Sequence, residues 1–147
     1  MKRDYAGVAV LAPTTVPYQR ETDHGAAWFI GRCLAELLAT AGLDKSDLDG
    51  LAASSLTLAP DGAVALSEHF GMTLRWLEQH QMGGASAIVS LRRAARAIQS
   101  GDADYVACIA GEGQMKDDFK DLIANFSRFS AQAVYPYGAA GPNAVFA

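Results

Sequence analysis

Residues 80–112, with the sequence HQMGGASAIVSLRRAARAIQSGDADYVACIAGE, decide the fold of this 147-residue chain. The stretch opens on the glycine pair 83–84, continues as an alanine- and arginine-rich segment typical of a helix, and meets a stop at Gly101. The apolar run 105–110 (YVACIA) then has the pattern of a strand buried on both faces. The order predicts a tight corner, a helix over 85–99 and a strand after it, as in a parallel βαβ unit.

The sequence before this stretch shows the same alternation. Apolar runs bounded by proline and glycine predict strands at 5–11, 51–58 and 74–79, and apolar spacings of three and four predict helices at 25–41 and 63–70. Strands that alternate with helices predict an α/β layered fold, with a parallel-dominated mixed sheet and helices on both faces.

Two further expectations concern the arrangement of these elements. The 105–110 strand, being apolar throughout, is expected to be central in the sheet. The 85–99 helix is expected to pack in the core layer, because one of its sides carries small residues that allow a close approach: Ala87, Ala94, Ala95 and Ala97.

Composition narrows the classes of function. The chain is 50% hydrophobic with a formal charge of −4, which suits one compact domain with apolar surface left for a partner. The nearest basic cluster, Arg92, Arg93 and Arg96, has helical spacing typical of a solvated helix face, so nucleic acid is not an expected partner. No apolar run approaches the roughly 20 residues of a membrane span. A cytoplasmic protein is predicted.

The two cysteines, Cys33 and Cys108, each lie in an apolar stretch. They provide neither a disulfide framework nor a metal site, so two buried thiols in a reducing compartment are expected.

The ungapped order of several residues after the glycine pair resembles the thiolase superfamily. Members of this superfamily carry a nucleophilic cysteine in a motif similar to Asn-x-x-Cys-small-Ser/Thr-Gly. An alanine-rich helix, the motif Ile-x-x-Gly-x-x-Asp, an apolar strand and the motif Gly-x-Glu then follow in this order. The matching positions here are Ala94, Ile98, Gly101, Asp104 and Glu112. Segments 41–43, 47–50 and 135–142 are also similar to thiolase-family sequences. Within the family, the similarity is closest to the sterol-carrier-type branch.

The resemblance implies the N-terminal half, or less, of a thiolase-like protein. It implies a thiolase-like core over residues 1–112 and the truncated start of a loop domain over 113–147. Residues 139–147 (AAGPNAVFA) start a helix-like pattern and stop with its apolar face unfinished, which favours a fragment or one piece of a larger assembly.

The frame set by Ile98, Gly101 and Asp104 places the family's nucleophilic cysteine on Gly84 and its asparagine on Gln81. Glycine has no side chain to accept an acyl group, and the two cysteines of the chain lie on other elements. The resemblance therefore implies a degenerate active site without thiolase chemistry.

The corner still offers a candidate binding site. Backbone amides at a helix start could hold an oxyanion or a thioester carbonyl, and the corner residues are Gly83, Gly84, Ala85 and Ser86. The alternative is that two glycines only permit a tight turn. The neighbouring His80 is a weak candidate for a general base, with a hydrogen-bonded structural role as the alternative.

Other candidates carry two interpretations each. Tyr135 and Tyr137, in a Gly/Pro loop, form either a substrate rim or a clamp between domains. Glu112 either faces the site or anchors a loop. Neither His24 nor His69 has a partner signal nearby in the sequence.

The resemblance implies three alternatives for function. The first is part of an acyl-CoA aldolase (lyase) of lipid or steroid degradation, which works with a small OB-fold partner and has its catalytic residues beyond position 147. The second is a non-catalytic acyl-CoA-binding or scaffold subunit, and the third is an inactive truncated product. No cofactor is expected apart from a coenzyme A thioester as possible substrate.

The resemblance also implies a homodimer, joined edge to edge through the third predicted strand, 74–79. The interface residues would be Trp76, Leu77 and Gln79, because an edge strand bearing a tryptophan needs a partner. The alternative is a monomer in which Trp76 packs on the 63–70 helix.

Overall fold

The computed structural model describes residues 4–58, 62–113 and 124. The chain divides into two units, residues 1–113 and 114–147, and nearly all of the described residues belong to the first. Tyr135, Tyr137 and the 139–147 segment, for which site or helix roles are predicted, lie outside the described residues.

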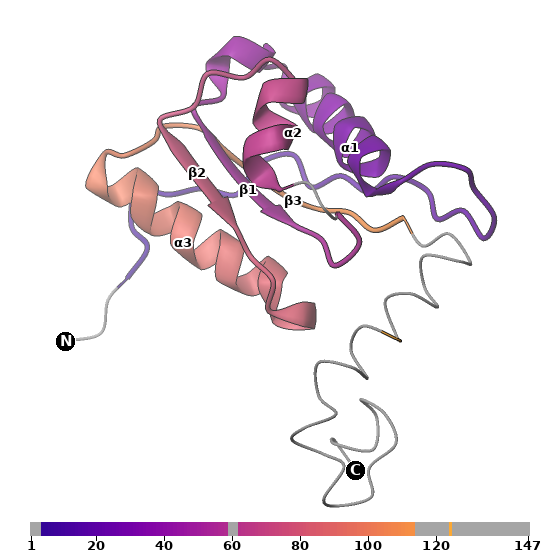
Figure 1. The fold of residues 1–147 in the computed structure, drawn as a ribbon. Coiled ribbons are helices and arrows are strands. Elements are labelled where there is room, and N and C mark those ends of the chain that lie inside the picture. The colour runs from indigo at the N-terminus through magenta and orange to yellow at the C-terminus, as the bar shows by residue number, and fades with distance from the viewer. Residues whose placement is uncertain (1–3, 59–61, 114–123, 125–147) are drawn as a thin grey trace, which may run out of the picture. The chain divides into compact units, whose positions relative to one another are not determined.

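The first unit is a three-layer α/β arrangement (Figure 1). Its strands are β1 (Gly50–Ser54), β2 (Trp76–Gln79) and β3 (Val106–Ala110), all parallel and in the order β2-β1-β3. Helix α3 (Ser86–Ser100) covers one face of the sheet, and α1 (Ala26–Ala41) and α2 (Ala63–His69) cover the other. Short 3₁₀ turns, η1 and η2, lie at Lys45–Asp47 and Gly83–Ala85. The predicted α/β fold class is confirmed.

The core lies between β1 and the helices on either side. Residues 50–53 of β1 are all buried, and Leu51 and Ile30 of α1 are fully enclosed. Both long helices end at a glycine, and the stop at Gly101 is one that the sequence predicts. Gly42 after α1 and Gly101 after α3 adopt left-handed φ angles of 67° and 82°, which only glycine takes readily.

Two adjacent residues join the first ends of all three strands. The carboxylate of Asp49 accepts hydrogen bonds from the amides of Asp104 (3.0 Å) and Tyr105 (2.9 Å), and it lies 2.8 Å from the guanidinium of Arg75. Gly50 packs so closely on β3 that a Cβ atom there would lie 2.6 Å from a methyl carbon of Val106. The Asp-Gly pair thus fixes the β1–β3 register.

The order of the strands corrects one expectation. Within the described residues the central strand is β1, and β3 is an edge strand that pairs only with β1. Its apolar sequence is explained by its two faces, since α1 packs on one and α3 on the other. A continuous apolar run reports burial of both faces and does not distinguish an edge strand from a central one.

The N-terminal segment is a second correction. Residues 5–11, predicted to be a buried strand, form a turn at Ala6–Gly7 followed by extended chain outside any sheet. Val10 and Leu11 are 74% and 63% exposed. The segment has the apolar pattern of a strand, but among the described residues no strand pairs with it, so its backbone has no ladder to join.

Smaller corrections concern lengths and faces. Strands β1 and β2 are shorter than the predicted 51–58 and 74–79, because the chain bends after Ser54 and again at Arg75, just before β2. The buried side of α3 is lined by small residues as expected, but Ala87 is exposed. The stripe consists of Ser86, Ser90, Ala94 and Ala97, four-residue and three-residue steps that follow one helix face.

Candidate functional site

The corner before α3 is held by local hydrogen bonds. Gly83 has a left-handed φ of 57°, and the short 3₁₀ turn η2 leads directly into α3. The hydroxyl of Ser86, whose residue is only 3% exposed, accepts a 2.9 Å hydrogen bond from the amide of Met82. Ser86 therefore fastens the corner, and the glycine at 83 is required by the backbone conformation, as the tight-turn interpretation predicts.

Gly84 differs from Gly83 in what its position demands. It is exposed, its φ is not left-handed, and a Cβ atom built there would meet nothing within 4 Å. The backbone would thus accept a side chain at 84. In the described part of the chain, the amides of Gly83 and Gly84 are used in no backbone hydrogen bond. The corner therefore offers free donors at the positive end of the α3 dipole.

His80 lies at the end of β2, beside this corner, and is 8% exposed. Its amide donates to Ala53 (2.9 Å), and its Nε2 atom lies 3.0 Å from the Glu78 carboxylate without the alignment of a hydrogen bond. That carboxylate also receives two hydrogen bonds from the guanidinium of Arg93 on α3. The hydrogen bonds to Glu78 and its negative charge raise the pKa of the Arg93 guanidinium above its ordinary value. His80 is thus enclosed beside an ion pair that joins β2 to α3.

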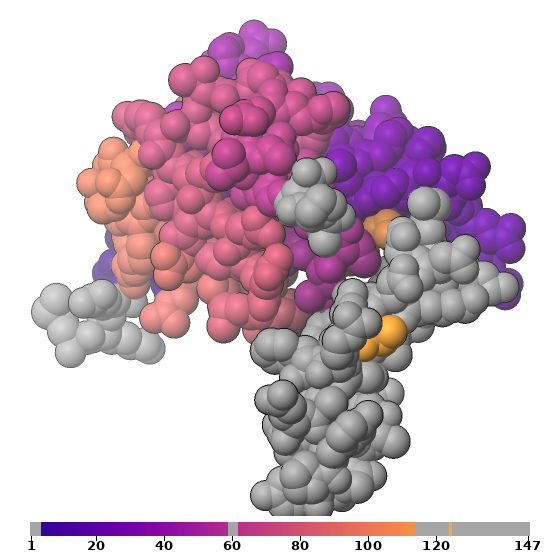
Figure 2. Space-filling view, in the orientation of Figure 1, coloured from indigo at the N-terminus to yellow at the C-terminus, as the bar shows by residue number. Residues whose placement is uncertain are grey.

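The three predicted interface residues on β2 lie on different sides of the strand. Leu77 packs against the hydrophobic core, and the side chain of Gln79 accepts a 2.9 Å hydrogen bond from the amide of Ala63 at the start of α2. Trp76 is half-buried and stays on the edge. In the space-filling view the surface over α2 and β2 faces the viewer (Figure 2), and β2 pairs with no second strand among the described residues.

Glu112 follows β3 and anchors the loop after β1. Its carboxylate accepts hydrogen bonds from the hydroxyls of Ser55 (3.1 Å) and Thr57 (2.7 Å) and from the amides of Leu56 (2.7 Å) and Thr57 (3.0 Å). These bonds match the loop-anchoring interpretation of Glu112. Gly113 beside it is also fixed, since a Cβ there would lie 2.6 Å from the Gly25 carbonyl carbon.

Neither cysteine lies at the corner. Cys108 is on β3, and burial raises the pKa of its thiol to about 11, so the thiol stays protonated at neutral pH. Cys33 is on α1, with its sulfur 3.9 Å from the hydroxyl of Thr14. Both thiols are free and half-buried rather than fully buried.

The remaining histidines pack on aromatic neighbours. His24 stacks on Trp28 with ring centroids 3.9 Å apart, and His69 meets Phe70 edge to face at 5.5 Å. In the ranges that the structure describes, no group of three or more His, Cys, Asp or Glu side chains is placed to hold a metal ion. No helix there is long and apolar enough to cross a bilayer.

Solved structures with the same arrangement of elements identify the fold. One is 3-oxoacyl-[acyl-carrier-protein] synthase III from Aquifex aeolicus VF5, which is 20% identical to this chain with a TM-score of 0.55. The match covers 60% of this chain and 30% of the synthase chain. Xanthomonas campestris OleA H285D is 21% identical to this chain with a TM-score of 0.56. The match covers 63% of this chain and 28% of the OleA chain. The chain has a thiolase-like fold.

A third solved structure, the Ltp2-ChsH2(DUF35) aldolase, is 21% identical over 80% of this chain and 35% of its own, with a TM-score of 0.53. This chain thus spans about a third of the length of the thiolase-like proteins it matches. No protein-family model matches its sequence, and no sequence of a curated protein does either.

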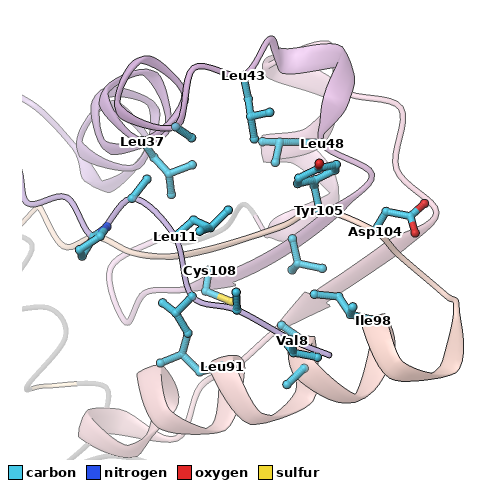
Figure 3. Close-up of a pocket in the computed structure, with 18 of the residues that line it drawn as sticks. Val8, Leu11, Leu37, Leu43, Leu48, Leu91, Ile98, Asp104, Tyr105 and Cys108 are labelled. Carbon is cyan, nitrogen blue, oxygen red and sulfur yellow. The ribbon is translucent and has the colours of Figure 1, made fainter. Parts of the chain in front are cut away.

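Sequence reasoning missed three features of the structure. The Arg93–Glu78 pair and the Asp49–Arg75 pair join residues 15 and 26 apart in the sequence, so no local pattern predicts them. The third is a cavity between β3 and residues 7–14 of the N-terminal segment (Figure 3). The free corner amides were the one part of the candidate site with a local signal, the glycine pair.

Proposed function

We propose that this chain forms the acyl-thioester-binding corner of a thiolase-fold enzyme that works without a covalent acyl-enzyme. The complete enzyme would be an aldolase (lyase) acting on an acyl-CoA of lipid or steroid degradation in the cytoplasm. Its acid–base residues would lie beyond position 147, so these 147 residues alone would be inactive. Residues 1–112 would form the core and 113–147 the start of a loop domain.

One observation carries the proposal: the corner at Gly84 is open and has no nucleophile. The position has space for a side chain, yet it carries none, and the amides of Gly83 and Gly84 are free of backbone partners among the described residues. Amides at a helix start stabilise negative charge on a carbonyl oxygen, which is useful for carbon–carbon cleavage as well as for acyl transfer. The protonated Cys108 is unsuited to take over acyl transfer.

A similar solved structure supports an aldolase. One of the similar structures is the Ltp2-ChsH2(DUF35) aldolase. The present chain would work in a similar arrangement, with a small OB-fold partner subunit and as a homodimer through the β2 edge. Gly83, Gly84 and Ala85 would contact the thioester, and Tyr135 and Tyr137 would form its rim. Ser86 would support the corner from inside.

The test combines ligand binding with intact-mass measurement. Acetyl-CoA and a longer acyl-CoA are titrated into the purified chain while the Gly83 and Gly84 amide signals are followed by NMR. We expect both signals to shift with acyl-CoA more than with coenzyme A alone, and the intact mass to show no acyl adduct. A turning-over adduct on Cys33 or Cys108, or no shift at millimolar acyl-CoA, would contradict the proposal.

The alternative is a non-catalytic scaffold that binds acyl-CoA or a partner subunit. It is favoured by Glu112, which corresponds to the glutamate of the thiolase-family Gly-x-Glu motif. In this chain the Glu112 carboxylate anchors the loop after β1 instead of facing the corner. The two alternatives differ once the complementary subunits are added. Retro-aldol cleavage of a β-hydroxyacyl-CoA that requires this chain and responds to a bulky substitution such as Gly84→Leu supports the enzyme. Cleavage that proceeds unchanged with Gly84→Leu supports the scaffold.

A further inference from the structure

The corner between β2 and α3 is anchored at both ends. At the β2 end, the amide of His80 donates a 2.9 Å hydrogen bond to the carbonyl of Ala53 on β1. At the α3 end, the hydroxyl of Ser86 accepts a 2.9 Å hydrogen bond from the amide of Met82. Between these anchors, the amides of residues 83–84 have no backbone partner among the described residues. The directions in which these two amides point therefore depend on how α3 sits relative to the end of β2.

A side-chain ion pair joins these two elements. Helix α3 packs mainly on β1 and β3. Its link to β2 is the Glu78 carboxylate, which accepts hydrogen bonds from Nε and Nη2 of Arg93, about two turns into α3. Two bonds between a planar guanidinium and a planar carboxylate fix the orientation of the groups as well as their distance. Strand β2, the corner, helix α3 and this pair thus form a closed loop from residue 78 to residue 93.

The Glu78 carboxylate is also the neighbour of His80. The Nε2 atom of His80 is buried without a hydrogen bond and lies 3.0 Å from a carboxylate oxygen of Glu78. The Glu78 side chain is 19% exposed, so its charge is mostly enclosed. Removing Arg93 would leave this charge facing an unaligned imidazole, and an enclosed charge without a bonded partner is unfavourable. Glu78 would then turn toward solvent, and the chain at His80, directly before the corner, would shift with it.

A second ion pair of the chain provides a comparison. Asp49 and Arg75 meet at the opposite end of the sheet, where the strands begin, and help to hold the strands together there. The Glu78–Arg93 pair lies at the end where β2 finishes and the corner starts. Both pairs are expected to add to stability, whereas a change in the directions of the corner amides is expected from the second pair alone.

We propose that Arg93 is a positioning residue for the corner. Through Glu78 it holds α3 against the end of β2 in the arrangement in which the free amides of residues 83–84 can donate to one carbonyl oxygen. Arg93 itself would not touch the ligand. The inference rests on the proposed thioester-binding role of the corner, but the position of the corner amides can be tested without an acyl-CoA.

The test combines a thiol introduced at the corner with substitutions of the ion pair. In a Gly84→Cys background, the pH midpoint of the reaction with 5,5′-dithiobis(2-nitrobenzoate) reports how strongly the corner amides act on position 84. Arg93→Gln removes the pair, and Arg92→Gln, the matched control, removes the same charge from the neighbouring, exposed position of α3. The double variant Glu78→Arg/Arg93→Glu reverses the pair. Acyl-CoA titration followed by NMR, on the same variants with Gly84 retained, gives the affinity, and urea unfolding gives the stability.

We expect Arg93→Gln to raise the thiol midpoint by about 0.5 unit more than Arg92→Gln does, and to weaken acyl-CoA binding at least about threefold. The reversed pair should recover about half or more of both effects. Arg75→Gln, at the other end of the sheet, should lower stability without either effect.

Two results would overturn the proposal. The first is equal midpoints and equal affinities for Arg93→Gln and Arg92→Gln. The second is a set of changes at the corner that follow the loss of stability across all variants, Arg75→Gln included. If the unmodified chain binds no acyl-CoA, the proposed function fails, and the thiol midpoints still decide the positioning role of Arg93.

Discussion

A cysteine introduced at position 84 tests whether the corner before α3 has the electrostatics expected of it. Gly84→Cys should fold normally, because the position has no neighbour within 4 Å of a Cβ atom and no left-handed φ. The new thiol would be exposed next to the free amides at the start of α3. Such positions lower the pKa of a thiol from about 8.5 to 7.5 or below.

The expected ratio of the reaction rates of the two thiols follows from comparing the introduced cysteine with Cys108, whose thiol has a pKa of about 11. At pH 7.5 a thiol with a pKa of about 7.5 is half ionised, whereas the Cys108 thiol is ionised to about one part in 3,000. The ratio of ionised fractions is therefore about 1,500. The lower basicity of the new thiolate reduces its intrinsic reactivity toward a disulfide about 40-fold, so the net advantage in rate is also about 40-fold. Burial of Cys108 increases it further.

The assay is the rate of reaction with 5,5′-dithiobis(2-nitrobenzoate) between pH 5 and 10, with the modified residue identified by mass. The matched control is Arg92→Cys, an exposed position in the middle of α3, whose rate should follow a pKa near 8.5. We expect the Gly84→Cys profile to have its midpoint at least one unit lower. A midpoint equal to that of the control would show that the corner amides do not act on the position 84 side chain, and the reasoning would be refuted.

Four further predictions concern stability and association. Gly50→Ala should lower the free energy of unfolding by about 1–3 kcal/mol, because its Cβ would lie 2.6 Å from a Val106 carbon, whereas Gly84→Ala should change it by less than about 0.5 kcal/mol; urea unfolding measures both. Burial opposes ionisation of Asp49, but the amides of Tyr105 and Asp104 and the charge of Arg75 outweigh it and lower its pKa. The folded form thus binds fewer protons than the unfolded form below about pH 4, so stability falls with falling pH there, and Asp49→Asn should remove that part of the acid dependence. Glu112→Gln should cost about 1 kcal/mol and speed amide exchange at Leu56 and Thr57, with Glu68→Gln, an exposed helix position, as the unaffected control. Sedimentation should show a homodimer that Trp76→Lys dissociates into folded monomers, and a monomeric unmodified chain at micromolar concentration would contradict this.

The sequence predicts those parts of the fold that have a local signal. The glycines at 42 and 101 stop helices because the left-handed conformation is encoded by one residue, and the apolar spacing of α1 and α3 reflects the face that each buries. The position of β3 in the sheet has no such signal. Its apolar run is equally suited to a central strand and to an edge strand between two helices, and only the tertiary pairing distinguishes them.

The candidate site shows the same division. The corner was predicted because two adjacent glycines before a helix are a local feature. The hydrogen-bond partners of Gln79 and Glu112 could not be predicted, since each of these side chains accepts from backbone amides that are distant in the sequence. For Glu112 the sequence offered loop anchoring as one of two interpretations, without indicating which loop. The N-terminal segment was assigned as a strand from its composition. Pairing requires a neighbouring strand, and residues 4–58 and 62–113 supply none to this segment.

The residues that carry the thiolase resemblance serve mainly to hold the fold together. Asp49 and Gly50 join β1 to β3, Gly101 closes α3, and Glu112 anchors the loop after β1. None of these roles depends on acyl transfer. These residues can therefore resemble the thiolase family in a protein that has no nucleophilic cysteine. The activity must instead be judged from position 84, where the backbone has room for a side chain and the sequence has glycine. The resemblance therefore supports the fold of this chain, and its chemistry has to be judged from the free amides of the corner before α3.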